Sequence, residues 1–182
     1  IKTIVDLPSD KALLKEYAEY LGGFPVIIKA QGGSHGVGII RVDSFESLSS
    51  IADYILSQLP NYYVMRQYID YKEHARLIVL GDKVIDSVKY HRVSGDFRSN
   101  VGHKLKVEPM KFSATTEQIA IKAVDVLNAE FGGVDILIDK QGKEHLAEVN
   151  IPCYFPRTQL TTGYDIAGDL VKYLKNKSEK IS

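Results

Sequence analysis

Residues 131–150 read FGGVDILIDKQGKEHLAEVN, and this stretch decides the fold of the C-terminal part of the chain. Two apolar runs, GVDILI and HLAEVN, flank a turn at residues 139–142, which predicts an antiparallel hairpin. Glu148 and Asn150 are two residues apart and therefore share a face, and strand pairing can bring Asp135 beside them. Such oxygen ligands, with no histidine or thiolate among them, suit magnesium carrying nucleotide phosphates better than zinc. The alternative is a surface hairpin with polar residues on its wet face.

The overall composition is that of an ordinary globular protein. The chain has 182 residues, of which 45% are hydrophobic and 25% are charged, enough for one compact unit that can divide into two lobes. Lys plus Arg equals Asp plus Glu at 23 each, so no positive excess favours nucleic acid or an anionic membrane. The single cysteine, Cys153, excludes an internal disulfide framework, and no apolar run reaches membrane-spanning length. We therefore expect a cytoplasmic protein with no nucleic-acid and no membrane partner.

The hydrophobic periodicity predicts a mixture of helices and antiparallel strands, an α+β chain. Helical spacing covers residues 10–21, 44–59, 115–128 and 165–175. Strand patterns precede the hairpin at residues 25–29, 39–42, 62–67, 75–80 and 83–90.

A glycine-rich loop, QGGSHGVG at residues 31–38, separates two of these strands. Its glycines let backbone amides approach phosphate oxygens without side chains in the way. The loop lacks the Gly-Lys-Ser/Thr ending of a P-loop, and strands on both sides exclude a Rossmann turn into a helix. What remains is a flap over phosphates, with Lys29 as a phosphate-facing cation. The alternative is a merely mobile hairpin tip.

The run GDFRSN, residues 95–100, is a third candidate element. Arg98 offers a planar fork of donors to a phosphate, and Ser99 and Asn100 can hydrogen-bond to nucleotide or metal-bound groups. The alternative is a solvated turn. Neighbouring cations alternate with apolar residues, so they line either a cleft or the wet face of a sheet: these are Arg76, Lys89 and Arg92.

Taken together, these segments resemble the ATP-grasp enzymes, and within them the RimK-type ligases that join the amine of glutamate or a similar amino acid to a carboxylate. The resemblance rests on ordered segments: FPVIIKAQGGSHGVGI, VMRQYI, HARLIVLGDKVI, GDFRSN, GGVDILI, HLAEVN and TTGYDIAG. It implies the ATP-grasp fold, two α+β lobes that bind nucleotide between their antiparallel sheets. Residues 1–60 would form the smaller lobe with the flap, and residues 61–182 the larger lobe with the acidic hairpin.

The resemblance also implies a role for individual residues. It assigns a catalytic role at the phosphoryl group to Arg98, and substrate binding is a further possibility for Arg76 and Lys89. Metal binding falls to Asp135, Glu148 and Asn150. The implied nucleotide-binding residues are Lys29, Gly33, Ser34, Gly36, Gly38, Gln67, Tyr68, Ile69, Ser99 and Asn100. The implied cofactors are ATP and Mg²⁺, with two ions in the site and Mn²⁺ as a possible substitute.

The implied reaction is ATP-dependent formation of an amide or peptide bond through an acyl phosphate. Its partners would be a small-molecule or peptide carboxylate and an amino acid. Ligases of this type carry a further N-terminal domain, which we expect in the complete protein, and a homo-oligomer is compatible with the sequence. Two alternatives remain: a phosphotransferase of the same architecture, and a non-catalytic nucleotide-binding module.

Three segments depart from the usual pattern of the family. The resemblance implies that Gln67, Tyr68 and Ile69 form the hinge that receives adenine. This hinge reads Arg66, Gln67, Tyr68 in place of Gln, Glu, Tyr. His74 stands where an aspartate usually precedes an Ile-Arg pair. Residues 151–157 read IPCYFPR in place of a small Ser-Pro-Gly turn, which suggests an unusual acceptor substrate.

Overall fold

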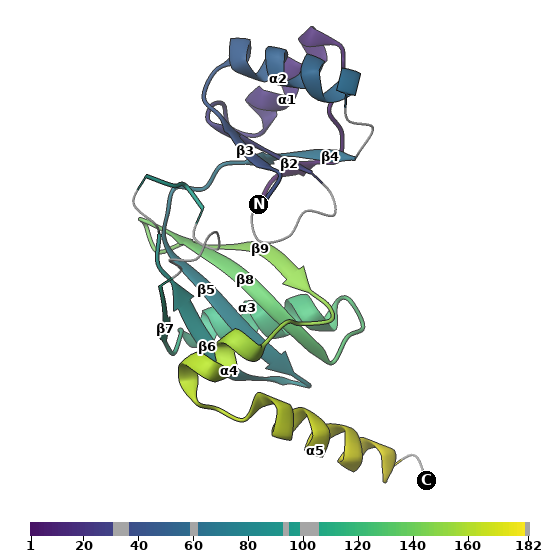
Figure 1. Cartoon of the computed structure of the whole chain (residues 1–182), viewed down its shortest axis with the longest axis vertical. Coiled ribbons are helices and arrows are strands. Elements are labelled where there is room, and N and C mark those ends of the chain that lie inside the picture. Colours follow the sequence, from purple (N-terminus) through teal and green to yellow (C-terminus); the bar gives the residue numbers. More distant parts are fainter. Residues whose placement is uncertain (31–36, 59–61, 93–94, 99–105, 181–182) are drawn as a thin grey trace. The chain divides into compact units, whose positions relative to one another are not determined.

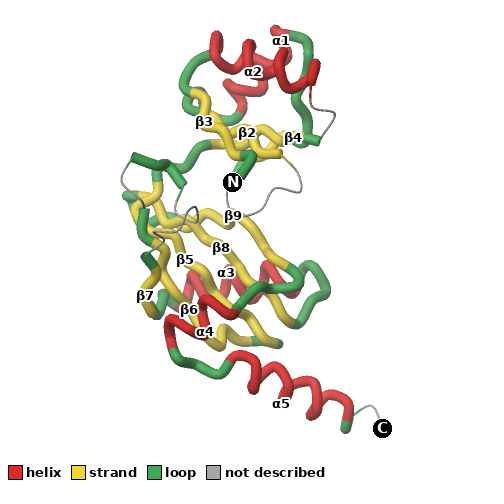
Figure 2. Tube along the Cα trace, viewed as in Figure 1, coloured by secondary structure: helices red, strands yellow, loops and turns green. Residues whose placement is uncertain are grey.

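The structure, a computed structural model, describes residues 1–30, 37–58, 62–92, 95–98 and 106–180. The chain divides into two compact units (Figures 1 and 2). The first comprises Ile1–Asp70 and Val93–Lys104, and the second Tyr71–Arg92 and Leu105–Ser182. Each unit has helices and one antiparallel sheet, so the predicted α+β class is confirmed.

The first unit is a four-stranded sheet with two helices on one face. Its elements are β1 (Thr3–Ile4), α1 (Lys11–Tyr20), β2 (Val26–Ala30), β3 (Ile39–Val42), α2 (Phe45–Gln58) and β4 (Tyr63–Gln67). The strands lie in the order β1-β4-β2-β3, and every neighbouring pair is antiparallel.

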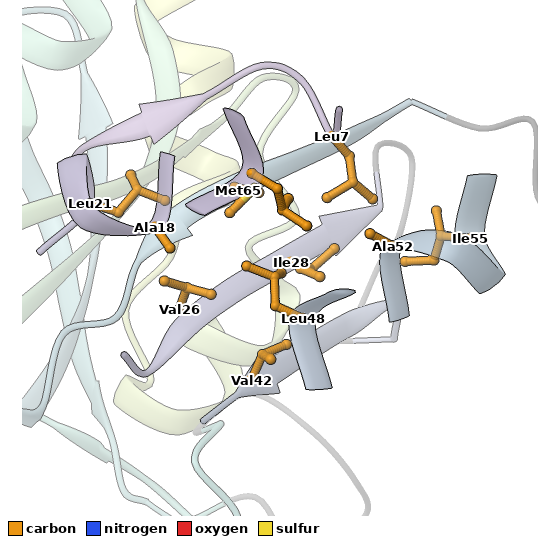
Figure 3. Packing of buried hydrophobic residues seen from close by; sticks show 11 residues of the cluster. Leu7, Ala18, Leu21, Val26, Ile28, Val42, Leu48, Ala52, Ile55 and Met65 are labelled. Atoms are coloured by element: carbon orange, nitrogen blue, oxygen red, sulfur yellow. The ribbon is translucent and has the colours of Figure 1, made fainter. Parts of the chain in front are cut away.

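Alternation along the strands builds the core of the first unit. Val26 and Ile28 of β2 point toward the helices and are fully buried, together with Met65 of β4 and Leu48 of α2 (Figure 3). Lys29 comes one residue after Ile28, so it belongs to the opposite face of the sheet. Burial of apolar side chains thus fixes which side of β2 carries the predicted phosphate-binding lysine.

The strand at residues 62–67 belongs to the first unit, which differs from the predicted boundary at residue 60. β4 pairs with β2 from Val26↔Gln67 to Ala30↔Tyr63, so it is a central strand of the first sheet. The compact unit therefore continues to Asp70. The alternation of apolar residues predicts that a segment is a strand, but it does not predict which other strand that segment pairs with.

The second unit is a five-stranded antiparallel sheet with helices on both faces and a last helix that extends past the end of the strands (Figure 1). Its elements are β5 (Tyr71–Leu80), β6 (Lys83–Tyr90), β7 (Val107–Pro109), α3 (Ala114–Asp125), β8 (Phe131–Asp139), β9 (Glu144–Asn150), α4 (Pro156–Thr162) and α5 (Ile166–Ser178). The strands lie in the order β7-β6-β5-β8-β9.

The two faces of the second sheet bury different kinds of side chain. The face under α3 is apolar and includes Leu77, Val134 and Ile136. The opposite face has a smaller apolar cluster of Ile78, Cys153 and Ile166 beside α4 and α5. The rest of that opposite face carries the polar groups described below.

Three elements were not predicted: β1, β7 and α4. The two strands have only two and three residues, too short to show a period of their own. None of the helices in the described part of the chain is long and apolar enough to cross a membrane.

Candidate metal centre

The hairpin of β8 and β9 forms as predicted and places the three proposed metal ligands together. Gly133 pairs with Asn150 and Asp135 pairs with Glu148, and directly opposed residues share a face of the sheet. The register then shifts between Asp135 and Ile136, where β9 contains one extra residue. The bulge comes after these two pairs, on the side of the turn, and does not change which way they face. Asp135, Glu148 and Asn150 therefore lie on the same face of the sheet, opposite α3.

Asp135 is buried and receives three hydrogen bonds. His74 Nε2 lies 3.2 Å from Asp135 Oδ1, and Arg76 Nη1 donates to Asp135 Oδ2 at 2.7 Å. Asn150 Nδ2 donates to the same Oδ2 at 3.1 Å and lies 3.5 Å from the carbonyl oxygen of Gly133. The Asp135 side chain is therefore held in one orientation by neighbours on β5 and β9.

These contacts keep Asp135 ionised. Burial alone favours the neutral acid, but the hydrogen bond from His74 and the positive charge of Arg76 together hold the pKa of Asp135 below its ordinary value. Burial also opposes the charge of Arg76, whose pKa is nevertheless raised because Asp135 lies beside it. The ion pair is thus a charged carboxylate and guanidinium inside the protein.

A glycine makes room for this ion pair. A Cβ atom at Gly133 would lie 2.5 Å from Arg76 Nη2 and 2.5 Å from Cys153 Sγ, closer than such atoms approach. Arg76 Nη2 is itself 3.7 Å from Cys153 Sγ. Burial raises the pKa of the Cys153 thiol, so the cysteine is a neutral packing group here.

The donor set of the hairpin fits Mg²⁺. Two carboxylates and an amide oxygen are hard ligands of the kind that Mg²⁺ binds beside substrate phosphates. Within the described ranges, no group of three or more His, Cys, Asp or Glu side chains could hold a metal ion. Because the hairpin supplies only two carboxylates, it would offer Mg²⁺ a partial shell, made of Asp135, Glu148 and the Asn150 amide oxygen. Exposed Glu148 and half-buried Asn150 leave that shell accessible.

Two of the predicted phosphate-binding residues at the flap, Lys29 and Gly38, belong to the described part of the chain. Lys29 pairs with Ile39 and Val64 at the end of β2. Gly38 has a φ of +81° and accepts a hydrogen bond from the Ala30 backbone at 2.9 Å, which closes the base of the loop. Several predicted nucleotide ligands lie outside the described residues: Gly33, Ser34, Gly36, Ser99 and Asn100.

The predicted adenine hinge follows β4 in the first unit. Ile69 is buried, and the Gln67 backbone N–H donates to the carbonyl of Lys2. The guanidinium of Arg41 lies over the Tyr68 ring, with its Cζ 4.9 Å from the ring centroid. The roles of Gln67, Tyr68 and Ile69 in base binding stay predictions.

Arg98, the predicted catalytic residue, is held by Asp96 in the first unit. Its Nε and Nη2 donate to the two carboxylate oxygens at 3.0 and 2.9 Å, and its backbone N–H also donates to Asp96. Hydrogen bonds from Arg98 lower the pKa of Asp96, so both groups are charged. The guanidinium has a defined position, and its action on a phosphoryl group stays a prediction.

The two possible substrate-binding cations differ in their surroundings. Arg76 is buried, and its guanidinium is directed at Asp135. Lys89 lies half-buried on β6 opposite Ala75 and Glu108. Because directly opposed residues share a face, Lys89 lies with Ala75 on the face under α3, whereas Arg76 lies on the opposite face and contacts the proposed metal ligand. Substrate binding by Arg76 and Lys89 stays a prediction.

Sequence reasoning did not identify the contact between His74 and Asp135. The sequence marks His74 only as a departure from the usual pattern of the family. The contact follows from the register of two strands. β5 pairs with β8 so that Arg76 lies opposite Asp135, and His74, two residues before Arg76, lies on the same face of the sheet. That register could not be derived before the pairing of β5 with β8 was known.

Comparison with known proteins shows the family to which the chain belongs. A model of the RimK-like ATP-grasp domain matches residues 4–174. A protein of Ectopseudomonas mendocina (strain ymp) named probable alpha-L-glutamate ligase is 29% identical over 91% of this chain and 55% of its own length. The ribosomal protein bS6–L-glutamate ligase of Escherichia coli O139:H28 is 28% identical over 86% of this chain and 52% of its own length.

The solved structures show the same fold at lower identity. The ATP-grasp ligase PsnB, in a complex with a phosphomimetic variant of its minimal precursor, Mg and ADP, superposes with a TM-score of 0.74. It is 17% identical and covers 96% of this chain and 52% of its own. Two α+β units with antiparallel sheets, arranged as in this ligase, thus define an ATP-grasp fold.

The chain belongs to the RimK-like ATP-grasp domain family. It spans about half the length of the curated relatives that it matches.

Proposed function

We propose that this chain is the ATP-grasp part of an ATP-dependent carboxylate–amine ligase that adds glutamate or a similar amino acid to a peptide or small-molecule carboxylate. The observation that carries the proposal is the Asp135–Glu148–Asn150 face in a RimK-like domain. The names of the relatives support the choice of glutamate. The E. coli relative is named for a ribosomal protein and PsnB is bound to a precursor, which favours a peptide as the acceptor.

In the proposed reaction, an oxygen of the substrate carboxylate attacks the γ-phosphorus of ATP. The bond from that phosphorus to the β,γ-bridging oxygen breaks, and ADP leaves. The amine nitrogen then attacks the acyl carbon, phosphate leaves, and the nitrogen loses a proton to give an amide. No nucleophilic side chain is needed, which agrees with the neutral and buried state of Cys153.

The residues of this chain would bind and balance charge in that reaction. Bound Mg²⁺ would supply positive charge to the phosphate oxygens. Asp135, Glu148 and Asn150 would hold Mg²⁺, for which PsnB with Mg and ADP is the structural precedent. Lys29 would contact phosphate oxygens, and Arg98 would stabilise charge on the phosphoryl group in the transition state. The number of ions, the use of Mn²⁺, a cytoplasmic location, an N-terminal domain and a homo-oligomer stay predictions.

The test is phosphate release and product mass with the complete protein, ATP, Mg²⁺, candidate peptides and glutamate. We expect release that needs both the carboxylate and the amine, and a product heavier by one amino-acid residue. Glu148→Gln should abolish it, because the substitution removes the charge of a metal ligand. Glu144→Gln is the matched control: Glu144 lies on the same strand but accepts a hydrogen bond from Thr116 at 3.2 Å.

Other outcomes would separate the alternatives. Phosphate transfer to a substrate without any need for an amine would identify a phosphotransferase. Binding of magnesium and ATP without turnover would identify a nucleotide-binding module. Full activity in Glu148→Gln would remove the metal assignment.

A second experiment examines Arg98. Arg98→Lys keeps the charge but loses the planar fork, so we expect turnover to fall about a hundredfold while ATP affinity changes little. Asp96→Asn is the control, because it weakens the Asp96–Arg98 pair without removing the guanidinium. An unchanged turnover number in Arg98→Lys, or an equal loss of turnover in both variants, would mean that Arg98 belongs to a solvated turn and does not act on the phosphoryl group.

A further inference from the structure

His74 is a buried polar side chain whose ring nitrogen faces the proposed metal ligand Asp135. It is 6% exposed, and its ring packs against Tyr71 and Tyr90, with ring centroids 6.2 and 5.1 Å away. The Tyr71 ring in turn lies under the guanidinium of Arg92, at 4.9 Å. The aromatic neighbours hold the imidazole in place, so its Nε2 is a fixed donor and not a mobile surface group.

The contacts of Asp135 nearly saturate its carboxylate. A carboxylate has about four lone-pair directions, two on each oxygen. Oδ2 accepts from both Arg76 and Asn150, and Oδ1 accepts from His74. Because an ionised carboxylate only accepts, His74 Nε2 must carry the proton. One acceptor direction remains, and it is on Oδ1.

Asn150 is oriented by the same argument. Its Nδ2 faces Asp135 because the carboxylate can accept but not donate. The amide oxygen of Asn150 is therefore the atom left for a metal ion. Asp135 and Asn150 can each contribute a single oxygen.

This arrangement discriminates between cations by geometry. Ca²⁺ takes six to eight oxygens at about 2.3–2.6 Å and often binds a carboxylate through both oxygens. Mg²⁺ requires a near-octahedral shell at about 2.0–2.1 Å and is satisfied by one oxygen from each ligand. A carboxylate with one free direction suits the smaller ion.

We propose that His74 is a positioning residue that, with Arg76 and Asn150, limits Asp135 to a single metal bond through Oδ1 and so makes the site selective for Mg²⁺ or Mn²⁺ over Ca²⁺. The inference rests on the metal site of the proposed function but not on amide formation. Without the His74 donor, Oδ1 gains a second free direction, and the carboxylate is held only at Oδ2, so Oδ1 loses its fixed position. His74 acts through Asp135 and does not itself bind the metal.

The experiment measures metal affinity rather than activity. Mn²⁺ binding to the full chain in the presence of ADP is followed by electron paramagnetic resonance, and Ca²⁺ is added as competitor. His74→Phe keeps an aromatic ring between Tyr71 and Tyr90 but removes the donor. We expect it to weaken Mn²⁺ binding about tenfold, the usual size of effect for a partner of a metal ligand, and to weaken Ca²⁺ binding less.

Two further substitutions separate positioning from packing. Gln can place its amide nitrogen near the position of His Nε2, so His74→Gln should restore most of the preference for Mn²⁺. Asn has the same amide on a side chain shorter by one methylene and cannot reach Oδ1, so His74→Asn should behave like His74→Phe. The pair keeps the test decisive if His74→Phe does not fold.

The same hairpin provides a matched control. His145 Nε2 lies 2.9 Å from Asp139 Oδ2, a second half-buried His–Asp contact at the turn end. His145→Phe should leave both affinities unchanged. Equal changes in Mn²⁺ and Ca²⁺ affinity, the same response in His145→Phe, or no Mn²⁺ binding by the unaltered chain would each overturn the inference. Metal selectivity as expected without amide formation would instead count against the proposed ligase function alone.

Discussion

The two sheets of this chain differ in what they bury. Among described residues, the fully or largely buried side chains of the first unit are apolar, and Ile28 and Met65 form its centre (Figure 3). The second unit also buries His74, Arg76 and Asp135. Burial of apolar side chains stabilises a fold. In a buried ion pair, the free energy needed to remove both charges from water offsets much of the attraction between them. The second sheet thus retains costly groups next to its proposed metal ligands.

The largest effect should come from breaking this ion pair. Arg76→Met leaves the Asp135 charge buried with one positive partner fewer, so we expect the free energy of unfolding to fall by about 3–5 kcal/mol. Urea unfolding of the metal-free chain at neutral pH measures it. The loss should shrink at low pH, where Asp135 can take up a proton. A loss below about 1 kcal/mol would mean that the pair contributes no more than an exposed one.

A cavity in the first core provides the apolar counterpart. Ile28→Ala removes buried methyl and methylene groups and should lower the free energy of unfolding by about 2–4 kcal/mol. No charge is left unpaired, so the loss should be the same at pH 7 and in acid. If the Ile28→Ala loss varied with pH as strongly as the Arg76→Met loss, the proposed difference between the two cores would be wrong.

A smaller effect is expected where the second sheet is tightly packed. Gly133→Ala puts a methyl group within 2.5 Å of Arg76 Nη2 and Cys153 Sγ, which should cost about 1–3 kcal/mol by overpacking. The double variant with Cys153→Ala frees space and should recover part of the loss in thermal unfolding. Equal stability of Gly133→Ala and the unaltered protein would show that Arg76 can move aside freely.

The smallest effect concerns the unaltered protein in acid. The pKa of Asp135 is lowered in the folded state, so the carboxylate contributes stability that is fully present above its unfolded pKa of about 3.9. This contribution is lost as the pH falls below that value and through the folded pKa. Unfolding free energies between pH 6 and acid should therefore fall less steeply in Asp135→Asn. Parallel curves would indicate that other carboxylates dominate acid unfolding.

The sequence was informative wherever the relevant interaction is local. The turn at residues 139–142 and the apolar runs around it predicted the hairpin, and their spacing placed Asp135, Glu148 and Asn150 on one face. The ordered segments predicted the family, which is confirmed. The predicted end of the first lobe at residue 60 missed β4, because its partner β2 is more than thirty residues earlier in the chain.

Local pattern alone therefore determined most of the secondary structure, the hairpin with its proposed oxygen ligands and the family of this protein. The reason is that strand alternation and turn chemistry act over a few residues. Only the tertiary structure decided that β5 lies beside β8 and aligns Arg76 with Asp135, that Gly133 leaves space for the guanidinium, and that His74 occupies one oxygen of the carboxylate. These contacts join residues about sixty positions apart, and their register is set by burial of the whole sheet rather than by any segment within it.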